Sequence, residues 1–228
     1  MLIKWGSIVV DGSGKLGGHV FSKGRGGATI RTIARNANPQ TTFQQIIRSR
    51  FTQLTQGWRN LTETERESWY DAESSFSRTN RFGDVVLLSG KNLYNSLNTN
   101  RQILGLGVIN LAPLPSEIPR GQVTNVEISL SNTQISLQGD FVSNQNYVVV
   151  ATKGLSQGMK NFKNEIRTIS VRESSSGGTS IGGLSPIYFD YIRRFGTPID
   201  GTKIFMGTYS ISVSGQRSPV SMVQAEFV

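Results

Sequence analysis

The sequence contains no cysteine and only one histidine, His19. Without cysteine there is no disulfide framework, no thiolate metal site and no cysteine nucleophile. A single histidine also argues against a zinc site, because such sites draw most of their ligands from cysteine and histidine. We therefore expect no cofactor and no metal, and we expect packing or assembly with partners to stabilise the chain.

Long apolar runs are absent as well. No stretch approaches the roughly 18 consecutive apolar residues of a transmembrane helix. The first residues also lack the basic, apolar and small-residue order of a signal peptide. We expect a soluble protein that is made in a cytoplasm and has no membrane partner.

The sequence patterns that resemble catalytic motifs are incomplete. Residues 154–158 read Gly-Leu-Ser-Gln-Gly, which matches a nucleophile elbow, but the histidine that this mechanism needs after the serine is missing. The spacing Gly12-x-Gly14-x-x-Gly17 matches a dinucleotide-binding loop, yet no helical pattern follows it before Phe43. We predict that the chain is not an enzyme and has no small-molecule substrate.

Acidic residues are scarce where basic residues gather. The net charge is +9, and residues 1–50 hold eight lysines and arginines against one acid, Asp11, which places +7 of the total there. A basic segment joined to a nearly neutral body indicates an anionic partner. Nucleic acid and an acidic protein surface both fit. The protein surface is favoured, because only Trp5 and Phe21 could stack on bases in the first 38 residues.

Glycine, in contrast, is abundant at the N-terminus, with eight residues in the first 27. Residues 1–38 read as an extended basic arm with short β-prone pieces at 19–22 and 29–33. Strands this short bury too little to be stable alone, so we expect the arm to become ordered against another subunit. Aromatic and arginine side chains are the usual hot spots of interfaces, which makes these residues candidate protein anchors: Trp5, Phe21, Arg25, Arg31 and Arg35. In the alternative of phosphate binding, the contacts come from Lys15, Lys23, Arg25 and Arg31.

Residues 39–110 have the pattern of a helical domain. One apolar stripe at the helical period consists of Phe43, Ile46, Ile47, Phe51, Leu54, Trp58 and Leu61. Thr41 with Gln44, and Thr62 with Glu65, have the spacing of capping boxes at two helix starts. A third helix begins near Ser89, and residues 81–84 form a loop. We predict three short amphipathic helices that form a small bundle or a platform for a neighbouring protein.

The remaining sequence predicts a β domain. Residues 111–121 contain three prolines and form a stiff linker. Residues 122–228 hold about seven short strands: 123–130, 134–137, 147–152, 166–171, 180–184, 203–213 and 221–228. This number fits an immunoglobulin-like sandwich, and the missing cysteines favour a fibronectin-III-like variant. A short helix after Pro186 directs Tyr188, Tyr191, Ile192 and Phe195 inward. The fold class is therefore α+β multidomain: an extended N-terminal arm, a small helical region and a C-terminal β-sandwich.

A further sequence pattern is carried by residues 11–23, 26–32, 38–41, 57–62 and 89–94, together with Glu65, Arg66, Trp69 and Gly83. With these segments, much of the first half resembles a family of virion-associated structural proteins of tailed phages that infect Bacteroidetes, including crAss-like phages. The family also places a proline-rich segment before a fibronectin-like C-terminal module. It implies an auxiliary capsid protein of the virion, attached to the major capsid protein or another virion protein through its arm and helices. The alternatives are a packaged basic protein next to DNA, and a tail, collar or host-surface binding component.

Overall fold

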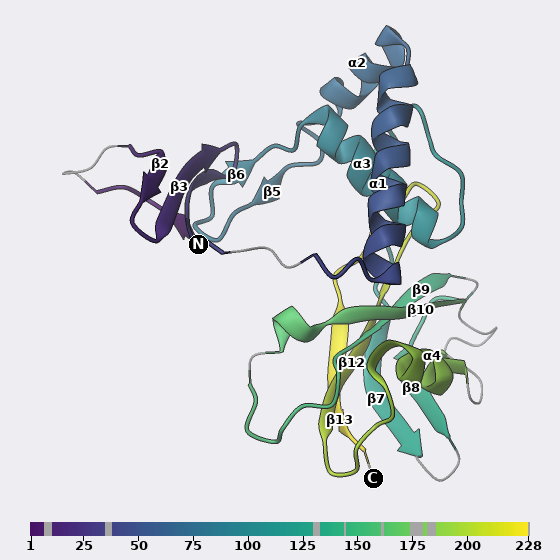
Figure 1. Ribbon diagram of the computed structural model, residues 1–228. Helices are drawn as coiled ribbons and strands as arrows, with labels where there is room; N and C mark the ends of the chain where they lie inside the picture. The colour runs from purple at the N-terminus through teal and green to yellow at the C-terminus, as the bar shows by residue number, and fades with distance from the viewer. Residues whose placement is uncertain are drawn as a thin grey trace. The chain divides into compact units, whose positions relative to one another are not determined.

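The computed structural model describes residues 1–6, 11–34, 38–129, 133–143, 145–160, 162–173, 180–181 and 186–227 (Figure 1). They form a mixed α+β structure with four α-helices and several small antiparallel sheets. The chain divides into two compact units. The N-terminal unit comprises Met1–Thr99 and Ile109–Pro115, and the C-terminal unit comprises Asn100–Val108 and Ser116–Val228. In the described part of the chain, no helix has both the length and the apolar character needed to cross a membrane.

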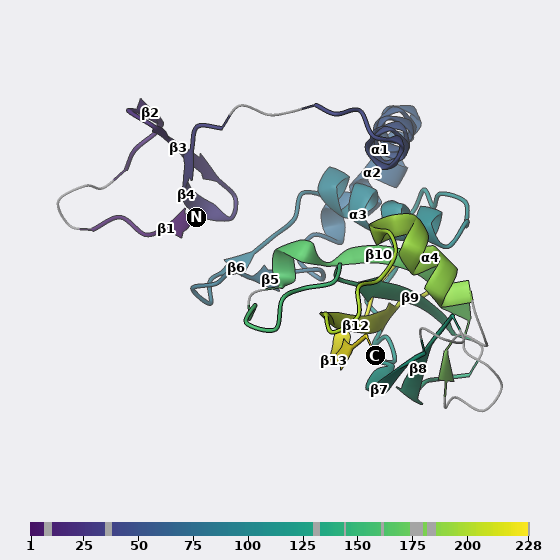
Figure 2. The same ribbon diagram turned by 60° about the horizontal axis from the view of Figure 1, so that its bottom comes forward.

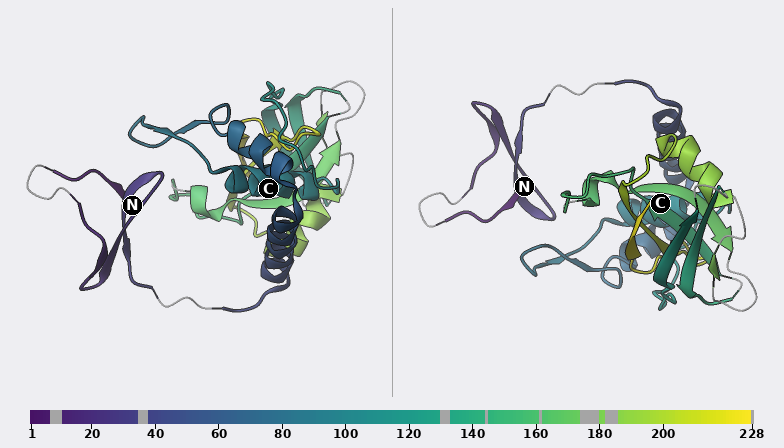
Figure 3. Two further views of the ribbon diagram at one scale, coloured as in Figure 1. Left: turned by 90° about the horizontal axis from the view of Figure 1, so that it is seen from above. Right: turned by 90° about the horizontal axis from the view of Figure 1, so that it is seen from below.

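The first strands form an antiparallel sheet of their own, drawn in purple in Figure 3. Its strands are β1 (Leu2–Ile3), β2 (Gly14–Leu16), β3 (His19–Gly24) and β4 (Gly27–Thr32), in the order β1-β4-β3-β2. Two-residue turns at 17–18 and 25–26 join the hairpins. Gly17 has a φ of 56°, a conformation that such turns favour and that glycine adopts without strain. The strands predicted at 19–22 and 29–33 are confirmed.

The dinucleotide-like stretch at residues 12–17 therefore runs through β2 and into the turn before β3. A pyrophosphate-binding loop of that type instead opens a helix, whose N-terminal amides meet the phosphates. The glycines here serve hairpin geometry.

The three predicted helices are confirmed as α1 (Thr42–Asn60), α2 (Glu63–Asp71) and α3 (Gly90–Ile103). The Thr41 side chain caps α1 by accepting the Gln44 amide at 3.3 Å. Thr62 and Glu65 form the reciprocal capping box of α2, with the Thr62 amide 2.8 Å from the Glu65 carboxylate. The capping box predicted for Thr41 with Gln44 is only half formed, because the side-chain oxygen of Gln44 has no hydrogen-bond partner among the described residues. The Thr41 and Thr62 side chains satisfy amides that a helix start leaves unpaired, so they fix where the helices begin.

An aromatic core joins the helices of the N-terminal unit. Its buried members are Leu54, Trp58, Leu61, Trp69, Leu93, Tyr94 and Leu97. The Tyr94 ring contacts both indoles edge-on, with centroids 5.3 Å from Trp58 and 5.3 Å from Trp69. Gly57 allows this close packing, because a Cβ there would lie 2.7 Å from the Tyr94 hydroxyl oxygen. The fully buried Asn98 side chain on α3 donates to the carbonyl of Ile109 and accepts the amide of the same residue. These two hydrogen bonds hold the segment around Ile109 against α3.

A small hairpin of the same unit lies between α2 and α3 in the chain. It consists of β5 (Arg78–Thr79) and β6 (Val85–Val86). The loop predicted at 81–84 is confirmed, and the Asn80 side chain organises it by accepting the amides of Phe82 at 2.8 Å and Asp84 at 3.0 Å.

The C-terminal unit contains two antiparallel sheets. Three strands, β7 (Gln122–Ser129), β8 (Gln134–Asp140) and β11 (Ser180–Ile181), have the order β11-β8-β7. Four more, β9 (Asn146–Ala151), β10 (Arg167–Glu173), β12 (Lys203–Ser210) and β13 (Ser221–Glu226), have the order β10-β9-β12-β13. A 3₁₀ turn at Lys163–Glu165 precedes β10. Each predicted strand of this region corresponds to one of these seven, although Leu130, residues 182–184 and Val228 lie outside the described residues.

Strand β9 is buried on both faces. Tyr147, Val149 and Ala151 belong to the core that the two sheets share, whereas Val148 and Val150 face a second cluster on the opposite side. Ile103 and Leu104, which follow Asn100 in the same unit, pack against this second cluster. The nearly continuous apolar sequence of β9 fits a strand that has no solvent-exposed face.

The helix predicted after Pro186 is confirmed as α4 (Pro186–Phe195), which packs against β8 and β10 (Figure 2). Tyr188 and Tyr191 are buried, and Ile192 and Phe195 pack on the same core. Burial raises the pKa of Tyr191 to about 12. The proline-rich stretch 111–121 is irregular, and its residues up to Pro115 belong to the N-terminal unit.

Candidate protein-binding surface

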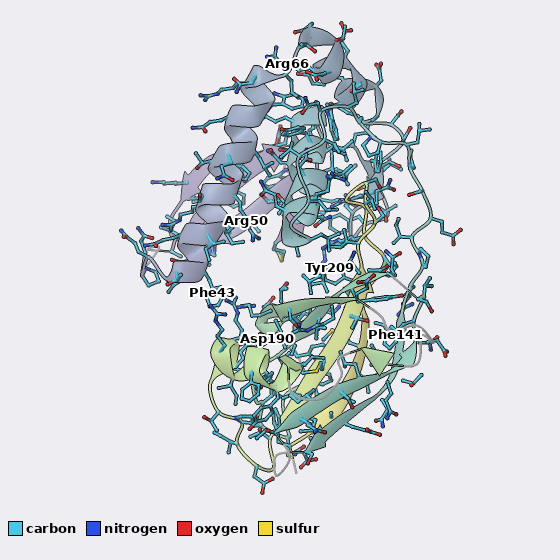
Figure 4. The ribbon with its side chains drawn as sticks, turned by 90° about the vertical axis from the view of Figure 1, so that its right-hand side faces the viewer. Phe43, Arg50, Arg66, Phe141, Asp190 and Tyr209 are labelled. Carbon is cyan, nitrogen blue, oxygen red and sulfur yellow. The ribbon has the colours of Figure 1, made fainter. Side chains whose placement is uncertain are left out.

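Helix α1 carries one apolar stripe, but only its second half is buried. Leu54 and Trp58 are 1% and 8% exposed, respectively. One and two turns earlier, Ile46, Ile47 and Phe51 are 42%, 59% and 57% exposed. Phe43, in the first turn of the helix (Figure 4), is 47% exposed. The apolar stripe therefore extends towards the start of α1, beyond the part that the core of the N-terminal unit covers.

The lengths of the helices are consistent with this division. Helix α1 has 19 residues, whereas α2 has 9 and α3 has 14. The aromatic cluster around Tyr94 lies against the Gly57 end of α1, so the side chains that cover the stripe come from that end. We call Ile46, Ile47, Arg50 and Phe51 the α1 face.

A single charge lies within the α1 face. Arg50 follows Ile46 by four residues and Ile47 by three, which places its side chain on the same side of the helix. It is partly exposed, and no ion pair or hydrogen bond of its side chain is found within the described residues. The helix has no acidic residue, so the whole face has a positive electrostatic character.

The exposed apolar area of this face is appreciable for a single helix. A phenylalanine side chain covers about 150–250 Å², so the three apolar side chains together offer on the order of 300 Å² at their observed exposures. A stable interface buries about 800 Å² per partner. The α1 face can thus supply the apolar centre of an interface but not the whole of it.

The N-terminal sheet separates the predicted anchors onto its two faces. Paired residues of antiparallel strands share a face, and Phe21 pairs with Ile30. The Trp5 ring stacks on Phe21 with 5.6 Å between centroids, so the two aromatic anchors come together on this face. Both side chains are already half-buried against each other and their neighbours.

The opposite face of that sheet carries a basic pair. Val20 pairs with Lys15 on one side and with Arg31 on the other, so these two cations lie in one row on the same face. Two strand spacings separate them by about 10 Å. Both side chains are exposed. We call Lys15 and Arg31 the basic row.

Two other predicted cations have carboxylate partners in their own unit. Arg25 lies in the β3–β4 turn and bonds Glu73 at 3.0 Å, and Lys23 bonds Asp11 at 2.9 Å. The Glu73 carboxylate also accepts the Gly90 amide at 2.6 Å; this bond, followed by Arg25, lowers the pKa of Glu73. Arg35 lies outside the described residues. Of the candidate residues, only Lys15 and Arg31 therefore have exposed cationic groups without such a partner among the described residues.

The sequence prediction did not single out Arg50 or the exposure of Ile46, Ile47 and Phe51. All the apolar members were placed in one stripe, and periodicity alone does not distinguish a covered half from an exposed one. A signal was present, because an arginine in the middle of the stripe is unusual for a face that is buried in a core. His19 is exposed on β3.

No cluster of three or more histidine, cysteine, aspartate or glutamate side chains that could hold a metal ion is found in the described ranges. Comparisons with protein-family models, with curated proteins and with solved structures find no match to this chain.

Proposed function

We propose that this chain is a structural protein of a phage virion, most simply an auxiliary capsid protein, that attaches to the shell through its N-terminal unit. The resemblance of residues 11–120 to virion-associated proteins suggests the setting, and the surface of the N-terminal unit supports an attachment role. In this proposal the major capsid protein or another virion protein is the partner. The protein is made in the host cytoplasm and functions in the particle.

The observation that carries the proposal is the division of the α1 stripe. Exposing Ile46, Ile47 and Phe51 to water is unfavourable, by roughly 25 cal/mol for each Å² of apolar surface. Contiguous apolar surface of this kind commonly marks a protein-interaction site. The basic row on the N-terminal sheet adds a second exposed feature of the same unit, suited to a partner with acidic groups.

For the C-terminal unit we propose an immunoglobulin-like sandwich of the fibronectin-III type. In support, its two sheets have three and four strands, and the first two strands share a sheet with the fifth. The third, fourth, sixth and seventh strands form the other sheet, as expected when the chain crosses between the layers of a Greek-key sandwich. Such folds serve many functions. The assignment therefore proposes a module that projects from the shell, but it does not specify the ligand of that module.

The basic row also suits phosphate, which keeps the DNA-proximal alternative testable. Binding of this type neutralises phosphates with lysine and arginine, and its affinity falls steeply as salt rises. Two cations in one row, with Lys23 and Arg25 already paired to carboxylates, provide few such contacts. Attachment to protein is therefore the better-supported function.

Limited proteolysis tests the proposal. The full-length protein would be digested free and as part of purified phage particles, and the cut sites identified by mass spectrometry. We expect cleavage in residues 1–41 of the free protein and protection of the same sites in particles.

The protein's absence from particles would overturn the proposal. Equal cleavage in both samples would show that attachment does not involve this segment. Retention of the free protein on duplex DNA at low salt, lost as salt rises, would instead favour the DNA-proximal role.

A further inference from the structure

We infer that the first half of α1 binds as a helix in an apolar groove of a partner protein, with a partner carboxylate facing Arg50. This inference specifies the attachment surface and rests on the proposed function only for the identity of the partner. Its basis is the α1 face: three exposed apolar side chains and one guanidinium on the same side of a regular, N-capped helix.

The position of Arg50 gives the chemistry of the groove. Ile46 lies one turn before it on one flank, and Ile47 lies on the other flank. A partner that covers both isoleucines must also cover the guanidinium, and an arginine loses its hydration there. Burying it is favourable only when a carboxylate pairs with it, because an unpaired buried charge is strongly destabilising. The groove must therefore be apolar along its length with an aspartate or glutamate near its middle.

A membrane surface is a poorer occupant of this face. Amphipathic helices that lie on bilayers keep their basic residues on the polar side, away from the apolar strip that enters the lipid. Here Arg50 lies inside the strip. The other cation of this half, Arg48, is two residues away and lies on nearly the opposite side of the helix, where it bonds Asn38 at 2.7 Å.

A second copy of the chain is also a poorer occupant. Pairing two α1 faces would bury roughly 600 Å² in total, well below the 1,200–2,000 Å² of stable interfaces. It would also bring two Arg50 side chains towards each other, with no acidic residue in either helix to separate them. The charge of the face thus favours a different, acidic partner.

The test uses the full-length chain with the photoreactive residue p-benzoylphenylalanine in place of Ile47. It is expressed in infected host cells during particle assembly and illuminated, and the cross-linked partner peptide is sequenced. We expect one protein, cross-linked at an apolar segment with an aspartate or glutamate within a few residues. Arg50→Glu in the same chain should lower the yield of the adduct at least tenfold, and Arg50→Lys by far less.

Arg48→Glu is the matched control. It makes the same change of charge two residues away, on the side of the helix that faces away from the groove. We expect it to lower the yield less than threefold. Circular dichroism and thermal unfolding of each variant would establish that the fold is retained, and reversing the charge of the partner's carboxylate should restore the adduct with Arg50→Glu.

Four outcomes would overturn the inference: no adduct; equal losses with Arg48→Glu and Arg50→Glu; an adduct only between two copies of the chain; or binding of the chain to phosphatidylglycerol vesicles that Phe51→Ala abolishes. The proposed function fails separately. If the adduct has the expected chemistry but the partner is not a virion protein, the inference stands and the virion role does not. If the partner is a capsid protein but Arg50→Glu has no effect, the virion role stands and the inference does not.

Discussion

The two units of this chain use apolar residues differently. In the C-terminal unit, β9 is buried on both faces, and α4 adds two buried tyrosines to the core. In the N-terminal unit, Ala28 is the only buried apolar residue among the described residues of the β1–β4 sheet, and half of the α1 stripe is exposed. The first arrangement stabilises a scaffold. The second leaves apolar and cationic side chains exposed, so under the proposed function the part of the chain that binds a partner differs from the part with the larger core.

The largest effect is expected in the core of the C-terminal unit. Leu137 on β8 is fully buried, and Leu137→Ala should lower the free energy of unfolding by about 2–5 kcal/mol through lost burial and a cavity. Ile30→Ala, on the partly exposed N-terminal sheet, should cost about 1 kcal/mol or less. Hydrogen exchange of the backbone amides, measured for each region, would compare them. Equal losses would contradict the contrast between the units.

Alkaline pH should destabilise the C-terminal unit through Tyr191. Burial raises its pKa to about 12, whereas the unfolded side chain titrates near 10. The folded state therefore holds a proton that the unfolded state releases, so stability falls as pH rises from about 10 towards 12, by on the order of 2 kcal/mol. Tyr191→Phe should flatten this part of the pH profile in urea titrations. An unchanged slope would show that another group is responsible.

A smaller effect is expected at the start of α2. Thr62→Ala removes the side chain that accepts the Glu65 amide and should cost about 1 kcal/mol. All three tryptophans lie in the N-terminal unit, so tryptophan fluorescence during denaturation reports on this unit. Thr62→Ser retains the hydroxyl and should restore most of the loss. If Thr62→Ser were as damaging as Thr62→Ala, the hydrogen bond would not be the cause.

The smallest effect on stability is expected on the α1 face. Phe51→Ala should change the free energy of unfolding by less than about 0.5 kcal/mol, because 57% of the side chain is exposed. Leu54→Ala, on the same stripe but buried, should cost about 2–5 kcal/mol in the same fluorescence measurement. A large loss with Phe51→Ala would mean that this residue serves the fold.

Local patterns predicted the elements well. The capping residues Thr41 and Thr62, the turn glycines and the alternation of the strands are properties of short sequence segments, and each element they predicted is found in the described residues. The site was predicted less well. Trp5 and Phe21 were grouped with Arg25 and Arg31 as one set of anchors, but the register of the strands separates the aromatic pair from Arg31, and Arg25 is paired with Glu73.

Local sequence was enough to predict that α1 is a helix with one apolar face, because spacing at the helical period defines a face whatever lies beside it. The positive charge of the N-terminal segment follows from composition alone. Which half of the α1 stripe is covered could be read only from the folded chain, because burial depends on neighbours that are remote in the sequence. Tyr94 packs 5.3 Å from Trp58 between ring centroids, whereas Phe51 is 57% exposed and is not a buried member of that core. The period of the apolar residues shows which way their side chains point from the helix, whereas only the packing of the folded chain shows what they contact.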